Sequence, residues 1–291
     1  MDRILFGDNQ FFGVNHMSEE KARQQAMRFQ KLDAITDVLQ IALGEGVGGF
    51  MCTTHERIAE IAEEVRANPE KWRGFNFYPG MPYAHKYANA VTELGYFEAL
   101  KQFLPSGGMI DAMVRGTKAV FSRDVESVIT LLVDAEMKMF QGLHTPVVFL
   151  QNVVTDLVLG LGYHDAFRIF SDHIRQKYNA EAGFITMNLP ALLEALDGVG
   201  LANPIICANY NKIAFRMSGG IEGYRAALDR RPARVIAMSV LASGALPARE
   251  AIEWIVNEPH VESILFGASS RANIESTVKL IREYDSRKLA A

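Results

Sequence analysis

Eight short apolar runs are spaced along the chain, and each is continuously apolar rather than alternating between apolar and polar residues. A short continuous run of this kind is typical of a parallel strand that is covered on both faces of its sheet. The predicted strands are 3–6, 48–53, 73–78, 146–151, 182–187, 203–208, 234–239 and 263–266.

Between these runs, apolar residues recur every three or four positions, which is the period of an amphipathic helix. The clearest such segments begin at Ile35, Ala166 and Ala248. Eight strands that alternate with helices predict a closed (β/α)8 TIM barrel, with residues 1–291 as a single domain. An open doubly wound sheet is the alternative, but no G-x-G-x-x-G pattern follows the first strand.

One connection breaks the regular spacing. Residues 79–123 separate the third predicted strand from the helix before the fourth, whereas such connections usually take about 2–6 residues. The segment contains helical pieces, such as 96–104, and leaves the carboxyl end of the strands, where barrel enzymes place their chemistry. We therefore expect a helical insertion that covers the barrel mouth as a lid or pocket wall. The alternatives are a packing embellishment and a dimer contact.

Composition and charge exclude several classes of protein. The 291 residues are 49% hydrophobic and 22% charged, and the net charge of −4 includes no block of like charge, so we expect no nucleic-acid partner. No apolar run is long enough for a membrane span, the N-terminus lacks a signal-peptide pattern, and two cysteines make no disulfide framework. These features predict a cytoplasmic protein that acts on small molecules; a homo-oligomer is compatible with the sequence.

Polar side chains follow the first three predicted strands, which are neighbours in a barrel. We take Asp8, His55, Tyr83, His85 and Lys86 as candidate catalytic residues, because these groups can pass protons to and from a substrate. Asp8, His55 and His85 could instead form a metal site with nitrogen and oxygen ligands. The sequence has no tight motif such as H-E-x-x-H, however, and does not favour a divalent metal. Polar loop residues and helix caps are the alternative interpretation.

Amide side chains lie at or near several strand ends, where they can orient hydroxyls or a carboxamide without adding charge. The candidate substrate-binding residues are Asn9, Gln10, Gln151, Asn152, Asn188, Asn209 and Asn211. The alternative is that asparagine simply suits strand exits and left-handed turns.

The loop after the last predicted strand has the composition of a phosphate-binding loop. Gly267 allows close backbone approach, and Ser269 and Ser270 lie at the start of a helix, whose free N–H groups attract an anion. Arg271 can add a two-point contact. An ordinary helix start, with a serine as its N-cap, is the alternative.

The C-terminal third also resembles a known family. Residues 235–255 resemble strand seven and its loop in the aldo-keto reductases, and residues 263–277 resemble their strand eight and phosphate loop. Residues 184–196 resemble their strand five and helix five, and residues 209–215 resemble their strand-six exit. The resemblance implies a TIM barrel and an NADP(H) cofactor. It implies that Asn188 holds the cofactor carboxamide and that Ser239 replaces the aromatic residue on which the nicotinamide stacks.

The family's catalytic Asp, Tyr, Lys and His do not carry over to this chain. Cys52 stands at the Asp position, Tyr78 or Pro79 at the Lys position and Gln151 at the His position, and the loop that should hold the Tyr is nearly absent. The sequence is therefore similar to a divergent member of the superfamily that lacks the tetrad. Tyr78, Tyr83, His85 and Lys86 follow the third predicted strand and could rebuild a proton source.

Three functions follow from these observations. The first is an enzyme of carbohydrate or other small-molecule metabolism that binds a phosphate-bearing ligand and moves protons on a carbonyl or hydroxyl compound, as in isomerisation, dehydration or aldol cleavage. The second is an NADP-dependent aldo/keto reductase with a rebuilt proton donor. The third is a non-catalytic ligand-binding protein on a decayed barrel. The richness of the polar cluster favours an enzyme.

Overall fold

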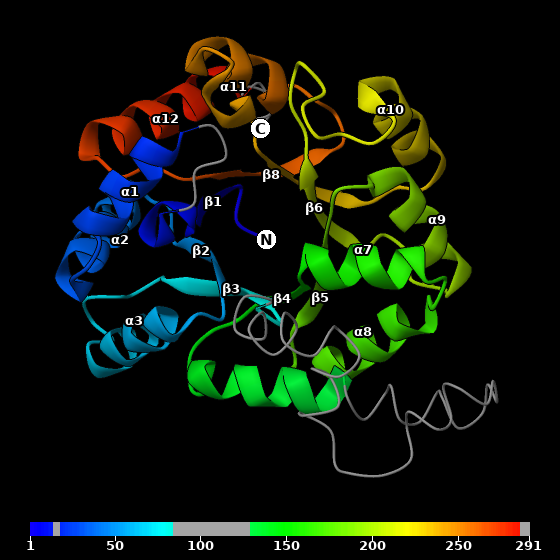
Figure 1. Cartoon of the computed structure of the whole chain (residues 1–291), viewed down its shortest axis with the longest axis horizontal. Coiled ribbons are helices and arrows are strands. Elements are labelled where there is room, and N and C mark those ends of the chain that lie inside the picture. Colours follow the sequence, from blue (N-terminus) through cyan, green and yellow to red (C-terminus); the bar gives the residue numbers. More distant parts are fainter. Residues whose placement is uncertain (14–17, 84–128, 286–291) are drawn as a thin grey trace.

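Eight parallel strands close into a barrel in the computed structural model, which describes residues 1–13, 18–83 and 129–285 (Figure 1). The strands are β1 Ile4–Gly7, β2 Gly49–Thr53, β3 Asn76–Met81, β4 Val147–Leu150, β5 Glu181–Thr186, β6 Ile205–Asn209, β7 Arg234–Met238 and β8 Val261–Phe266. Each pairs in parallel with the next, and Leu5 pairs with Leu265 to close the ring between β1 and β8. The predicted TIM barrel is confirmed.

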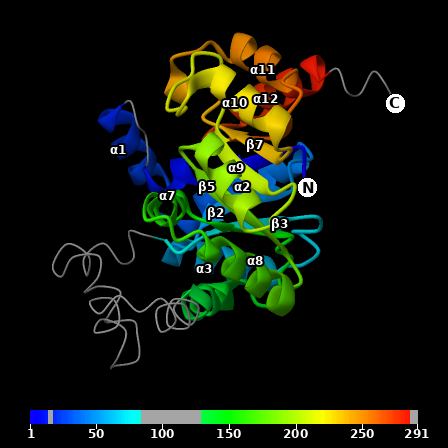
Figure 2. The same ribbon diagram turned by 90° about the vertical axis from the view of Figure 1, so that its right-hand side faces the viewer.

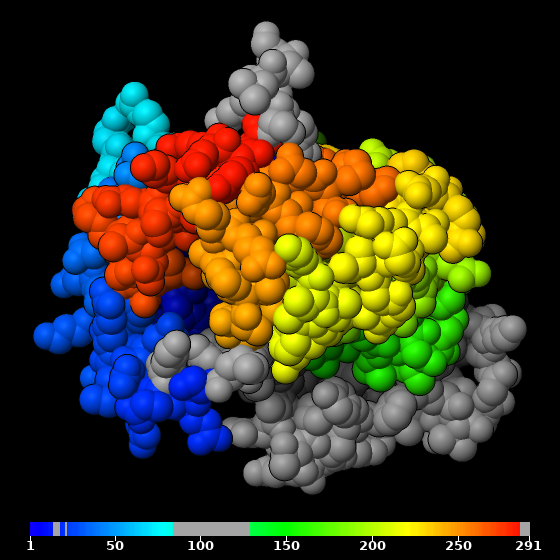
Figure 3. Space-filling model, turned by 90° about the horizontal axis from the view of Figure 1, so that it is seen from above, coloured from blue at the N-terminus to red at the C-terminus, as the bar shows by residue number. Residues whose placement is uncertain are grey.

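Helices surround the barrel and cover the outer face of its strands (Figure 1). They are α2 Leu32–Gly44, α3 Glu56–Ala67, α8 Asp165–Tyr178, α9 Leu189–Gly198, α10 Gly220–Arg230, α11 Ala248–Val256 and α12 Arg271–Tyr284, with further helical turns at 129–137. Two more helices, α1 Glu19–Arg28 and α7 Asn152–Gly160, lie toward one end of the barrel (Figure 2). The helices of the C-terminal part, coloured yellow to red, pack side by side in the space-filling view (Figure 3). In the described ranges, no helix combines the length and apolarity that a membrane crossing needs.

The third strand lies three residues later than the sequence predicts. Pro79 and Gly80 weaken a strand, so the pattern alone ends it at Tyr78. Pairing with β2 instead carries β3 through both residues, to Gly80 opposite Thr53. As a result Tyr78 lies inside the barrel wall and not at the strand exit, which removes it from the residues that could rebuild a proton source.

Alternating side chains along the strands form two apolar clusters, one inside the barrel and one between the strands and the helices. The inner cluster includes Leu5, Met51, Tyr78 and Phe149, whereas neighbouring residues such as Phe50 pack outward. At the amino end, the Tyr78 hydroxyl donates a hydrogen bond of 2.7 Å to the Asp2 carboxylate. The barrel interior is therefore filled, and chemistry is confined to the ends of the strands.

The two ends of the barrel differ in what they carry. The helices α1 and α7 lie toward one end and the N-terminus toward the other (Figure 2). The first connection holds a 3-10 helix, Asn9–Phe12, and α1 before α2 begins. Of the predicted insertion 79–123, only the part up to Tyr83 is described, so its helices and its covering role stay predictions.

Candidate active site

Asp8 directly follows β1 at the carboxyl end of the barrel. Its Oδ2 accepts two hydrogen bonds from Thr53, one from the backbone N–H at 2.7 Å and one from the hydroxyl at 2.8 Å. Burial raises the pKa of Asp8, and the bonds from Thr53 offset only part of that effect. Within the described residues, no other residue donates a hydrogen bond to Oδ1 of Asp8.

His55 and Tyr83 follow β2 and β3, and Tyr83 lies close enough to Asp8 to be affected by its charge. Nδ1 of His55 accepts a hydrogen bond from the backbone N–H of Arg57 at 3.0 Å and so caps α3. The His55 ring lies 5.6 Å from the Tyr83 ring, centroid to centroid. Burial lowers the pKa of His55, and burial together with the charge of Asp8 raises the pKa of Tyr83. Both shifts favour the uncharged form of the ring concerned.

A buried carboxylate that sequence reasoning missed joins this group. Glu136, only 1% exposed, accepts hydrogen bonds from the Thr54 hydroxyl and from the backbone N–H of Tyr83. It thereby ties the exits of β2 and β3 to the helical turns at 129–137. A signal was present, because Glu136 occupies an apolar position of the helical stripe that continues with Phe140.

The predicted amides around β1 and β4 occupy different settings. Gln10 is buried, donates to the Gly7 carbonyl at 2.7 Å, and places its Oε1 2.3 Å from where a Cβ on Gly267 would lie. It therefore packs the exit of β1 against the exit of β8. Asn9 is exposed, Gln151 is half-buried just after β4, and Asn152 begins α7.

The amides of the β6 exit hold a loop in place. Asn209 donates to the Arg216 carbonyl at 3.1 Å, and Asn211 bonds both backbone groups of Phe215, at 2.8 and 3.0 Å. Asn188 caps α9 by accepting from a backbone N–H at 3.4 Å. These bonds position backbone on the half of the mouth opposite Asp8, and substrate contact by the three amides stays a prediction.

Left-handed backbone gathers in the loops after β6 and β7. Five non-glycine residues there have positive φ: Ala214 at 56°, Arg216 at 55°, Ser239 at 54°, Ala242 at 47° and Ser243 at 58°. Such conformations cost roughly 1–3 kcal/mol each and cluster at binding and catalytic sites. These two loops therefore adopt a specific backbone conformation that the surrounding structure must stabilise.

The loop after β8 leaves its candidate phosphate-binding groups at least partly accessible. Gly267 and Arg271 are exposed, Ser269 and Ser270 are half-buried, and Ser270 caps α12 by accepting from Asn273 N–H at 3.4 Å. Arg271 also pairs with Glu275 at 3.3 Å. Hydroxyls, a guanidinium and a helix N-terminus form a donor set that fits the phosphates of NADP(H), whereas Ser239 offers no ring to the nicotinamide.

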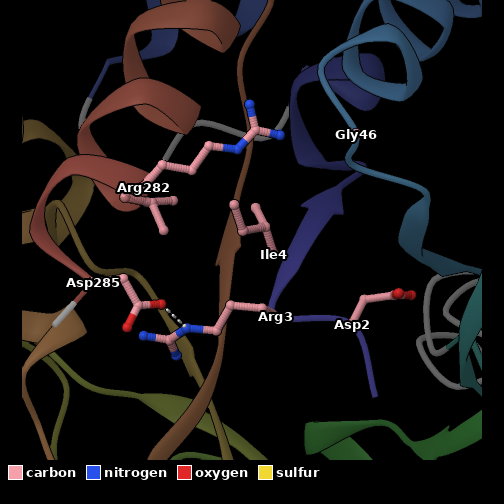
Figure 4. A pocket seen from close by; sticks show the side chains of 7 residues that line it. Asp2, Arg3, Ile4, Gly46, Arg282 and Asp285 are labelled. Carbon is pink, nitrogen blue, oxygen red and sulfur yellow. Dashed lines mark hydrogen bonds and ion pairs between the residues drawn. The ribbon is translucent and has the colours of Figure 1, made fainter. Parts of the chain in front are cut away.

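Two surface pockets mark the two ends of the barrel. One of about 180 Å³ at the amino end is lined by Asp2, Arg3, Arg282 and Asp285, among others, and Arg3 extends toward Asp285 at 2.8 Å (Figure 4). A larger one, of about 470 Å³, lies between the exit of β5 and the loop after β6. None of the predicted site residues in the described ranges lines either pocket.

Metal and thiol chemistry find little support in the described residues. No group of three histidine, cysteine or acidic side chains in the ranges 1–13, 18–83 and 129–285 could hold a metal ion. Cys52 and Cys207 are buried, and burial raises the pKa of both thiols, which makes them poor nucleophiles. His85 and Lys86 lie outside the described residues.

Comparisons with known proteins agree on the fold. No family model matches the sequence, and no curated protein does. Among solved structures, the Bombyx mori aldo-keto reductase in complex with NADP shares 9% identity at a TM-score of 0.58, covering 98% of this chain and 89% of that one. The aldose reductase from Giardia lamblia shares 13% identity at a TM-score of 0.53, covering 99% and 92%. An aldo-keto reductase from a Medee basin deep-sea metagenome library shares 11% identity at a TM-score of 0.56, covering 98% and 91%. The chain has the barrel fold that these aldo-keto reductases share.

Proposed function

We propose that this protein is an enzyme that moves a proton on a small carbonyl or hydroxyl compound, with Asp8 as the acid–base group. One observation carries the proposal: a buried carboxyl of raised pKa is held through one oxygen by Thr53, while its other oxygen has no hydrogen bond from another described residue. A raised pKa brings a carboxyl closer to the operating pH, where general acid–base catalysis is most efficient.

The neighbours of Asp8 fit the same chemistry. Tyr83 keeps its proton and can donate a hydrogen bond to a substrate oxygen, which stabilises negative charge on that oxygen as a proton leaves carbon. Neutral His55 packs against Tyr83 and leaves Nε2 for a second hydrogen bond, because Nδ1 is used by Arg57. Isomerisation, dehydration and aldol cleavage all depend on such transfers.

Solvent-proton exchange tests this proposal without knowledge of the full reaction. The protein is incubated in D2O with dihydroxyacetone phosphate, dihydroxyacetone and a set of other hydroxycarbonyl compounds, and loss of the C–H signal beside the carbonyl is followed by NMR. We expect enzyme-dependent exchange for at least one compound, together with loss of exchange in Asp8→Asn. Exchange that persists in Asp8→Asn would contradict the role of Asp8.

A second candidate function is NADP-dependent reduction of a carbonyl compound at the same mouth. Two observations favour it: the fold shared with aldo-keto reductases, one of them bound to NADP, and the donor set at 267–271. When bound, the cofactor supplies a hydride. Ser269, Ser270 and Arg271 would hold its phosphates, and Asp8 or Tyr83 would supply the proton for the carbonyl oxygen.

Cofactor titration distinguishes this candidate from the first. If Arg271 contacts the phosphate that distinguishes NADPH from NADH, Arg271→Ala weakens NADPH binding by about tenfold or more and leaves NADH binding nearly unchanged, because it removes a charge-assisted contact. Nucleotide fluorescence measures both affinities. Equal losses for the two nucleotides, or no binding of either by the unaltered protein, would count against it.

A further inference from the structure

The larger of the two pockets, at the carboxyl end of the barrel, lies apart from the acid–base group. It lies on the side of the barrel that contains β5 and β6. It is lined by Met187, Ala214, Arg216, Met217 and Ser218 and has a volume of about 470 Å³. Two thioether side chains form apolar walls, and one guanidinium and one hydroxyl are the polar groups of its lining. The lining contains no acidic side chain.

Arg216 is the charged group of this pocket, and it is exposed. Within the described parts of the chain, no carboxylate lies within ion-pair distance of its guanidinium. Its guanidinium carbon lies 5.3 Å from the centroid of the Phe215 ring, a cation–π contact that orients the side chain. The nearby carboxylate of Asp156 is instead bonded by Thr186 and the backbone N–H of Met187.

The backbone around Arg216 is fixed in an unfavourable conformation. Ala214 and Arg216 both have left-handed φ, at 56° and 55°. Two carboxamides that are almost fully buried, those of Asn209 and Asn211, hold this loop through the carbonyls of Arg216 and Phe215. Strain that is held by buried hydrogen bonds indicates a preorganised site more than a flexible surface loop.

We propose that this pocket binds the anionic end, carboxylate or phosphate, of a small molecule, with Arg216 as its anion-binding residue and Met187 and Met217 packing on the adjoining carbon atoms. A planar guanidinium without a carboxylate partner matches the geometry of either anion. The site is independent of the proton chemistry proposed above, because binding uses none of the residues at the exits of β1 to β3.

Methionine methyl groups report binding at this pocket directly. The protein has 12 methionines, and two of them line the pocket. In protein labelled with ¹³C at the methionine methyls, the signals of Met187 and Met217 are assigned with Met187→Leu and Met217→Leu. Succinate and glycerol 3-phosphate are the anionic probes, and butane-1,4-diol and glycerol are their uncharged counterparts.

We expect succinate, glycerol 3-phosphate or both to shift the two signals in a saturable manner that weakens with added salt, while the uncharged counterparts do not. The anion of higher affinity identifies the preferred group. Arg216→Gln lowers that affinity by about tenfold or more. Lys212→Gln, which alters an exposed cation of the same loop that pairs with Glu250 at 2.8 Å, leaves it unchanged.

Three results would overturn the proposal: equal shifts with the uncharged counterparts, an unchanged affinity in Arg216→Gln, or an equal loss in Arg216→Gln and Lys212→Gln. None of these readouts requires turnover. Failure of the acid–base function therefore leaves this test intact, and failure here leaves the exchange experiment intact.

Discussion

Two carboxylates at the carboxyl end of the barrel each accept hydrogen bonds from a threonine hydroxyl and a backbone N–H, but they differ in how many of their oxygens these bonds occupy. Asp8, after β1, accepts both the hydroxyl and the backbone N–H of Thr53 on a single oxygen. Asp156, on α7, divides its bonds: Oδ1 accepts the Thr186 hydroxyl at 2.5 Å and Oδ2 the Met187 N–H at 3.0 Å. Burial raises the pKa of both carboxyls.

The difference separates a carboxylate that positions backbone through both oxygens from one that we propose is reactive. Asp156 uses both oxygens to fix the exit of β5, so a positioning role explains the contacts of both oxygens. Asp8 fixes the exit of β2 with one oxygen, and its other oxygen accepts no hydrogen bond from another described residue. Matched substitutions at the two positions therefore separate positioning from chemistry.

The largest expected effect is on turnover. Asp8→Asn should lower the rate of substrate proton exchange by at least about a hundredfold, because the amide cannot act as an acid or a base. Asp156→Asn should change that rate by less than about threefold, since its carboxyl does not meet the substrate. NMR exchange rates at saturating substrate measure both. A similar loss in the two variants would remove the distinction drawn here.

The second effect is on pH dependence, and its sign follows from the raised pKa of Asp8. The folded protein binds the Asp8 proton more tightly than the unfolded chain does, so this residue lowers stability as pH rises through the ordinary and then the raised pKa. Asp8→Asn should therefore gain stability relative to the unaltered protein as pH rises from 3 toward 8. Urea unfolding at several pH values measures this difference, and a gain that grows toward acid would contradict it.

The fold was largely predictable from the sequence because continuous apolar runs and helical stripes report burial directly. Stripes such as Ile35 to Ala42 are buried as expected. The third strand was misplaced because pairing with β2 overrides the weakening effect of Pro79 and Gly80. A one-dimensional pattern contains no information about such pairing.

The candidate site was only partly predictable. The sequence singled out Asp8, His55 and Tyr83 because strand exits converge in a barrel, and the latter two lie in ring contact. It did not reveal Glu136, whose partners come from distant segments, or the pocket around Arg216, which depends on left-handed backbone that only the folded loop displays. Residues whose contacts depend on the folded conformation of distant segments are the ones that a sequence pattern misses.

The third effect is on stability and concerns Asp156, both of whose carboxylate oxygens accept hydrogen bonds. Asp156→Ala should lower the free energy of unfolding by about 2 kcal/mol, because it leaves the Thr186 hydroxyl and the Met187 N–H without their acceptor. Chemical denaturation at pH 7 measures the change. The matched control is Glu194→Ala on the same half of the barrel, which removes a carboxyl of α9 and should change stability by less than about 0.5 kcal/mol. Equal losses would mean that the bonds of Asp156 contribute nothing specific.

The smallest effect tests the threonines that hold the two carboxylates. Thr53→Val removes a hydroxyl that donates to charged Asp8, so the pKa of Asp8 should rise further and the pH at which activity changes should move upward. Activity on the plateau should stay within about threefold, because the backbone N–H of Thr53 still holds the same oxygen. Thr186→Val alters the equivalent bond to Asp156 and should leave the pH profile in place. The rate of proton exchange between pH 4 and 9 measures both variants, and a profile that moves in Thr186→Val but not in Thr53→Val would assign the titrating group to Asp156.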